Sequence, residues 1–156
     1  MRRYDYVFTD CLTFDDPAGR RIRLWIPEEV EIENEQDFMD WYVDKIVGVL
    51  GDEPFEVFVN ATFLPDRIAP QYDSLWTVER MDRVIEAIVR KGVPVEINAR
   101  FRIPSAAFIR RAKAAAVRFT FGTNNVDANL GRLEYCLNMI DACELTPEDI
   151  YIPRRP

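Results

Sequence analysis

Short apolar runs alternate with longer segments of helical periodicity along most of this 156-residue chain. The apolar runs have strand length and are rich in aromatic and β-branched residues, as in strands of a buried sheet. They occupy residues 4–9, 55–59, 93–98 and 118–121. Apolar residues recur at helical spacing over residues 34–50, 77–91, 104–115 and 130–142. Because strands alternate with helices, this pattern predicts an α/β fold with a parallel sheet and right-handed crossovers.

The N-terminal part departs from this alternation. Residues 12–14 and 21–25 flank a turn cluster, Asp15-Asp16-Pro17-Ala18-Gly19, so we expect a β-hairpin there. We treat residues 1–156 as a single domain of three parts. These are a strand, hairpin and acidic loop over 1–33, repeated α/β units over 34–152 and a tail over 153–156.

Local signals predict where the helices begin and end. Asn34 and Thr77 are suited to cap the helices that follow them, and Pro104 is suited to a helix start. Gly51 and Gly92 follow the first two helical patterns, where a glycine commonly ends a helix. A short last helix is expected after Thr146.

Charge and cysteine content narrow the class of protein. The net charge of −7 argues against nucleic acid or an anionic membrane as partner. No apolar run approaches the roughly 18 residues that a membrane span needs, and we expect no signal peptide. Three cysteines without CxxC spacing indicate reduced thiols, two of which, Cys136 and Cys143, we expect to face the core beside Leu137. We therefore expect a cytoplasmic protein.

The chain contains no histidine. This excludes imidazole metal ligands and every mechanism in which histidine is the base.

Polar residues follow the predicted strands, where parallel strands would bring them to one edge of the sheet. Amides, carboxylates and guanidiniums at such an edge suit a phosphate- or carboxylate-bearing small molecule. The candidate substrate-binding residues are Asp10, Asn60, Asn98, Arg100, Arg102, Thr123, Asn124 and Asn125. The alternative is that the asparagines satisfy loop backbone and the arginines are merely solvated.

Three further side chains have open roles. We expect Glu96, inside a predicted strand, to pair with an arginine, although it could be a base with a raised pKa. Asp10 could be a lone metal ligand. Cys11 could be a nucleophile, but no base accompanies it.

Residues 73–141 resemble the C-terminal half of the PHP family, the polymerase-and-histidinol-phosphatase-like metal-dependent phosphoesterases. The resemblance rests on EIN at 96–98 with IPSAAFIRRAKAA after it, on a strand closing in GTNN, and on LGRLEYC. The segments YDYVFTD and VNATFLP resemble earlier parts of the same half. The resemblance implies about half of a distorted TIM-like barrel, here with an N-terminal β-hairpin, since a full barrel takes about 250 residues.

The metal-ligand positions of that family are changed in this chain. The family has His-Pro where this chain has Asn60-Ala61, and Asp-x-His where it has Asn124 and Val126. The family's histidine after the opening strand is also missing, and its His-x-His motif belongs to the absent half. Asparagine brings an oxygen without a charge, so the usual metal centre cannot be assembled from these residues.

The resemblance therefore leaves two functions open. The first is a PHP-like metal-dependent phosphoesterase or hydrolase homologue that lacks the usual metal site. The second is a non-catalytic module that binds a small anion or a protein and needs a second chain to complete the barrel. No cofactor is expected, and a divalent Mn, Zn, Fe or Mg ion would need ligands from elsewhere. Half a barrel exposes strand edges, so we expect a homo-oligomer or a complementary chain.

Overall fold

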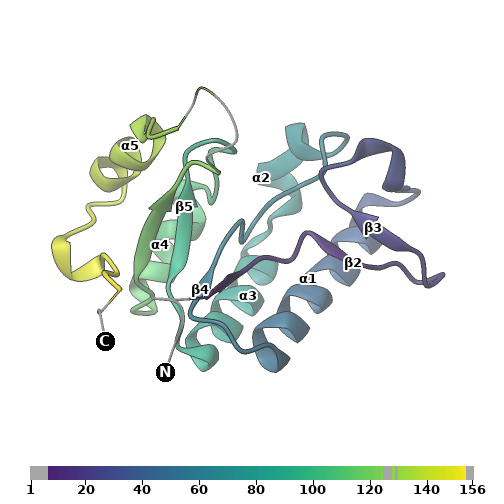
Figure 1. The fold of residues 1–156 in the computed structure, drawn as a ribbon, viewed down its shortest axis with the longest axis horizontal. Helices are drawn as coiled ribbons and strands as arrows, with labels where there is room; N and C mark the ends of the chain where they lie inside the picture. The colour runs from purple at the N-terminus through teal and green to yellow at the C-terminus, as the bar shows by residue number, and fades with distance from the viewer. Residues whose placement is uncertain (1–6, 125–127, 129, 154–156) are drawn as a thin grey trace.

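The computed structural model describes residues 7–124, 128 and 130–153. Four parallel strands form one sheet in the order β1-β4-β5-β6 (Figure 1). Their bounds are β1 Phe8–Thr9, β4 Val57–Phe58, β5 Val95–Asn98 and β6 Phe119–Gly122. The predicted α/β class and the parallel arrangement of the strands are confirmed.

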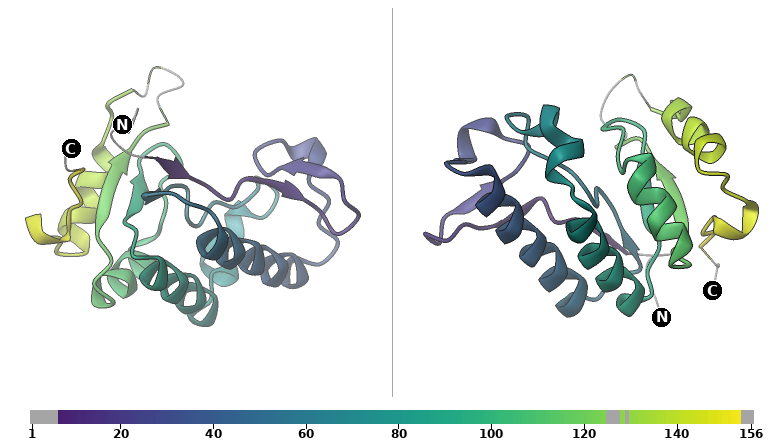
Figure 2. Two further views of the ribbon diagram at one scale, coloured as in Figure 1. Left: turned by 60° about the horizontal axis from the view of Figure 1, so that its bottom comes forward. Right: turned by 180° about the vertical axis from the view of Figure 1, so that it is seen from behind.

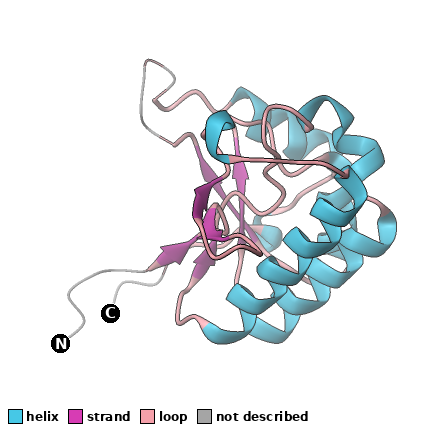
Figure 3. Ribbon diagram, turned by 90° about the vertical axis from the view of Figure 1, so that its right-hand side faces the viewer, coloured by secondary structure: helices cyan, strands magenta, loops and turns pink. Residues whose placement is uncertain are grey.

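Helices cover one face of this sheet (Figure 3). The longer ones are α1 Glu35–Asp52, α3 Val78–Lys91, α4 Ala106–Ala114 and α5 Glu134–Ala142, and α1 and α3 run side by side (Figure 2). Phe58, Val95 and Phe119 lie in one row across the sheet and are fully buried in the core. These three side chains lie on the helix-covered side of the sheet, which explains why they are apolar.

Side-chain caps set the start of the helices. The Asn34 side chain accepts hydrogen bonds from the backbone N–H groups of Gln36 and Asp37, and Thr77 accepts one from Arg80. α3 ends at Gly92, whose φ of 73° is in the left-handed region that glycine adopts readily. These three predictions are confirmed.

Two predicted boundaries are wrong. α1 continues through Gly51 to Asp52, because that glycine keeps a helical conformation and the chain turns extended only at Glu53. α4 begins at Ala106 with Ser105 as its side-chain cap, so Pro104 precedes the helix and follows a cis peptide bond.

The predicted hairpin is present as β2 Thr13–Asp15 paired antiparallel with β3 Arg21–Arg23. It does not pair with β1. Instead the Phe14 ring packs against α1, with centroids 5.0 Å from Trp41 and 6.0 Å from Tyr42. The acidic segment after it begins with a 3₁₀ helix, Pro27–Glu29, and Glu29 pairs with Arg23.

Short helical turns connect the remaining elements. A 3₁₀ turn at Ala69–Gln71 and the short helix α2 Tyr72–Leu75 lie between β4 and α3. A 3₁₀ helix at Pro147–Asp149 has Thr146 and Asp149 as a capping box, which confirms the predicted final turn.

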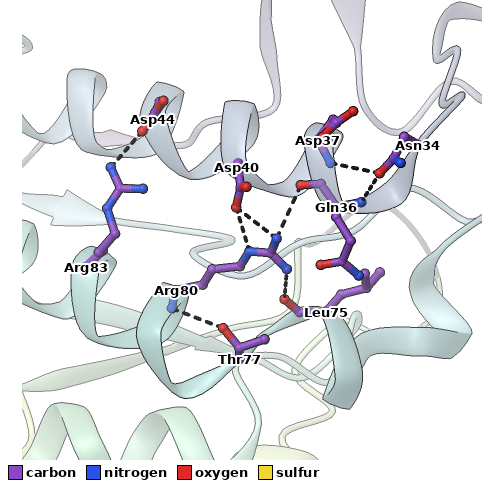
Figure 4. Close-up of polar contacts among 9 residues, drawn as sticks. All are labelled: Asn34, Gln36, Asp37, Asp40, Asp44, Leu75, Thr77, Arg80 and Arg83. Atoms are coloured by element: carbon purple, nitrogen blue, oxygen red, sulfur yellow. Dashed lines mark hydrogen bonds and ion pairs between the residues drawn. The ribbon is translucent and has the colours of Figure 1, made fainter.

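A buried arginine joins the helix layer together (Figure 4). The Arg80 side chain, on α3, donates to Asp40 Oδ1 on α1 at 2.8 and 3.1 Å. It also donates to the backbone oxygens of Gln36 and Leu75 at 3.2 and 2.9 Å. Its guanidinium thus connects α1, α2 and α3.

The thiols of Cys11, Cys136 and Cys143 are all free and buried, as the spacing predicted for the last two. Leu137 is 58% exposed, so its predicted burial is wrong. Among the described residues, no helix combines the length and the apolar character that crossing a membrane requires.

Candidate functional site

The loops that follow β4, β5 and β6 meet at the carboxyl edge of the sheet. Asn60, Arg102 and Asn124 in these loops have φ values of 54°, 56° and 58°. Non-glycine residues seldom adopt this left-handed conformation, and asparagine tolerates it best. Such residues concentrate at functional sites, where the surrounding structure holds them in place.

Asn98 is the centre of this edge and is fully buried. Its amide nitrogen lies 3.1 Å from Asn60 Oδ1, 2.7 Å from Glu96 Oε1 and 2.6 Å from Asn124 Oδ1. Its own oxygen accepts from the backbone N–H of Phe101 at 3.0 Å. An amide nitrogen carries two hydrogens, so these three acceptors compete for them.

Two carboxyl groups belong to this cluster. Burial raises the pKa of Glu96, and the hydrogen bonds that it accepts from Asn98 and the Asn60 backbone offset this only in part. Burial likewise raises the pKa of Asp10, against bonds from the Leu12 backbone and the Asn60 side chain. Burial and the nearby Asp10 carboxylate raise the pKa of Cys11 far above its usual range, which does not suit a nucleophile.

The predicted ion pair of Glu96 with an arginine is wrong. It accepts hydrogen bonds from the Asn98 side chain and the Asn60 backbone, and no arginine of the described chain lies within ion-pair distance of it. The side chain lies across Gly122 of β6 instead. A Cβ atom at that glycine would stand 2.0 Å from Glu96 Oε2, so only glycine leaves room for the carboxylate there.

The cluster opens into a pocket of about 380 Å³ on the sheet face that the helices leave uncovered. Asp10, Asn60, Glu96, Thr123 and Asn124 line it, together with apolar side chains of the strands. With these two carboxylates, this pocket disfavours an anion.

The two arginines lie elsewhere. Arg100 and Arg102 line a separate pocket of about 330 Å³, together with Arg132, Glu134, Tyr135, Asn138 and Ala99. Among the described residues of this lining, three carry a guanidinium group and one carries a carboxylate. The structure therefore divides the candidate residues between an acceptor-rich pocket and an arginine pocket, and Asn125 lies outside the described residues.

Arg102 is held in position by an aromatic ring. Its guanidinium carbon lies 5.6 Å from the centroid of Tyr135, in cation–π geometry. Tyr135 donates a hydrogen bond to the backbone oxygen of Pro104 at 2.6 Å, and burial raises its pKa to about 12. The ring that supports Arg102 is thus fixed at both its face and its hydroxyl.

Sequence reasoning missed Arg132, Tyr135 and Asn138 as site residues. All three lie in or just before α5, which follows the third loop of the edge. Tyr135 and Asn138 are three residues apart within α5, which places both on one side of the helix and was the available signal.

The donor set limits which metal chemistry this edge can support. No group of three or more His, Cys, Asp or Glu side chains suited to a metal ion occurs among the described residues. Asp10 and Glu96 are the carboxylates of the acceptor-rich pocket, and its other polar ligands are uncharged. These residues do not fit a multinuclear phosphoesterase centre.

Comparison of the chain with models of protein families, with characterised proteins and with solved structures found no match in any of the three.

Proposed function

We propose that this chain is a PHP-like α/β module that binds a phosphate- or carboxylate-bearing small molecule and does not hydrolyse it. We further place it in the cytoplasm, in keeping with its three free thiols. The parallel sheet with helices on one face is compatible with about half of a TIM-like barrel.

One observation carries the binding proposal. Arg100, Arg102 and Arg132 converge on one pocket in which Glu134 is the only carboxylate among the described residues of the lining. Arginine binds phosphate and carboxylate through paired N–H donors, and all three arginines are exposed to solvent. The proposal that the chain does not hydrolyse its ligand is supported by the lack of histidine and by the neutral amides of the acceptor-rich pocket.

Binding is tested by titration calorimetry with inorganic phosphate at low ionic strength. Arg132→Gln should weaken binding about tenfold or more, since a charge-assisted hydrogen bond contributes about 1.5–3 kcal/mol. Arg90→Gln, which removes an exposed charge on α3 outside the pocket, is the matched control and should bind as the unmodified chain does. Equal weakening by both variants, or no binding at all, would contradict the proposal.

Hydrolysis is tested separately with phosphomonoesters and added Mn²⁺, Zn²⁺ or Mg²⁺. We expect no turnover above the protein-free rate. A protein-dependent rate that persists through purification to constant specific activity would contradict this and indicate a metal-dependent phosphoesterase.

A second candidate function is association with another chain, and we commit to a second copy of this one. β1 is an edge strand of the sheet. Its first residue, Phe8, is 63% exposed, and the preceding Val7 is 49% exposed. An exposed apolar edge strand readily pairs with another strand. At the opposite edge, Tyr151 already donates its backbone N–H to Phe119 of β6 at 2.7 Å, so β1 is the freer edge.

A further inference from the structure

The arginine pocket does not end at its guanidiniums. Arg100, Arg102 and Tyr135 also form a wall of a neighbouring pocket of about 520 Å³. The shared wall means that a ligand whose charged group sits among the arginines can extend into the second pocket.

Aromatic rings dominate the second pocket. Phe63, Tyr72, Phe101 and Tyr135 line it. The rings of Phe63 and Phe101 pack edge to face with centroids 5.0 Å apart, and Arg100 lies 5.9 Å from the Phe101 centroid. Such a wall offers ring faces and edges to a flat ligand.

The polar atoms of the tyrosines are already engaged. Tyr72 Oη donates to Thr62 Oγ1 at 2.5 Å and accepts from the Ser105 backbone N–H at 3.2 Å. Tyr135 is tied to Pro104 as described above. The two rings are therefore held in place, and a rigid wall loses little entropy when a ligand binds.

We propose that the ligand is an anion attached to an aromatic body, with the phosphate or carboxylate among Arg100, Arg102 and Arg132 and the ring against Phe101 and Tyr135. This inference rests on the proposed function and names its ligand class. Asp66 and Asp73, both exposed at the same pocket, favour a ring that carries hydrogen-bond donors.

Titration calorimetry with four probes tests this inference: inorganic phosphate, glycerol phosphate, phenyl phosphate and phenylacetate. Phenyl phosphate should bind about fivefold more tightly than glycerol phosphate, since an aromatic contact contributes about 0.5–1.5 kcal/mol. If phenylacetate binds more tightly than phenyl phosphate, the charged group of the ligand is a carboxylate. If phenyl phosphate binds more tightly, it is a phosphate. The aromatic body itself is supported when phenyl phosphate binds more tightly than glycerol phosphate.

A variant separates the two proposals. Phe101→Leu should remove the advantage of phenyl phosphate over glycerol phosphate, because leucine keeps an apolar wall without a ring. Arg132→Gln should weaken all probes. If phenyl phosphate binds no more tightly than glycerol phosphate, the aromatic inference is overturned, whereas the proposed phosphate binding still holds. Failure of every probe overturns the proposed function together with it.

Discussion

Asn98 shows how one residue organises the acceptor-rich pocket. It occupies the end of β5, and its buried amide contacts Asn60, Glu96 and Asn124, which come from three strands or the loops after them. A buried polar group is costly unless bonded, so this residue forces the loops into a common arrangement.

The carboxyl group of Glu96 makes stability depend on pH. Its pKa is raised in the folded chain, whereas an unfolded glutamate titrates near about 4.3. The folded protein therefore holds this proton more tightly. The stability that it contributes is fully present below the unfolded pKa and is lost as pH rises through the raised value.

We predict that Glu96→Gln gains stability relative to the unmodified chain as pH rises from about 5 to 8, because it cannot lose this proton. Urea unfolding at several pH values measures the difference. Glu86→Gln, which removes an exposed carboxylate of α3, is the control for the loss of one charge. A difference that stays flat, or that falls with pH, would show that burial does not hold the Glu96 proton.

At the scale of the elements, the helix layer depends on one buried guanidinium. Arg80 is 8% exposed and bonds to α1 and to the end of α2, whereas the neighbouring Arg83 meets Asp44 at 2.7 Å near the surface (Figure 4). Both side chains join α3 to α1, but their burial differs. Exposed ion pairs contribute little to the free energy of unfolding, whereas the loss of a buried hydrogen-bond partner leaves polar groups unsatisfied.

We predict that Arg80→Met lowers the free energy of unfolding by about 2–3 kcal/mol, since the oxygens of Gln36 and Leu75 lose their donor. Arg83→Met is the matched control and should cost less than about 1 kcal/mol. Equilibrium urea unfolding of both variants measures the two values. Similar losses for the two variants would mean that burial of Arg80 adds nothing.

At the scale of the whole molecule, the sheet has one covered and one open face, and its β1 edge has no partner strand among the described residues. The hairpin packs on α1 and leaves that edge open. The two pockets of the carboxyl edge lie on a single chain, so the proposed binding does not require association.

We predict a dimer at micromolar concentrations in light scattering, formed through β1. Phe8→Glu should shift the mass to that of a monomer, because it places a charge in the apolar contact. Ile152→Glu, at an equally exposed apolar residue after α5, should leave the dimer intact. A monomeric mass of the unmodified chain at all concentrations would exclude the stable form of this association.

The sequence by itself determined the features that depend on neighbouring residues. The alternation of apolar runs and helical periods predicted the strands, and the caps at Asn34 and Thr77 followed from bonds to backbone within three residues. The predicted helix end at Gly51 was wrong because a glycine ends a helix only where the chain needs a left-handed residue. The presence of a glycine does not by itself show where that need arises.

Tertiary structure alone decided how the polar residues are grouped. The strand pattern placed Asn60, Asn98 and Asn124 at one edge, and the structure brings them into contact. The direction of the loop after β5 sends Arg100 and Arg102 toward α5, and this separates them from the amides. Likewise, Glu96 also accepts from the Asn60 backbone and Arg80 pairs with Asp40. Both partners lie far away in the sequence, so packing rather than local pattern selects them.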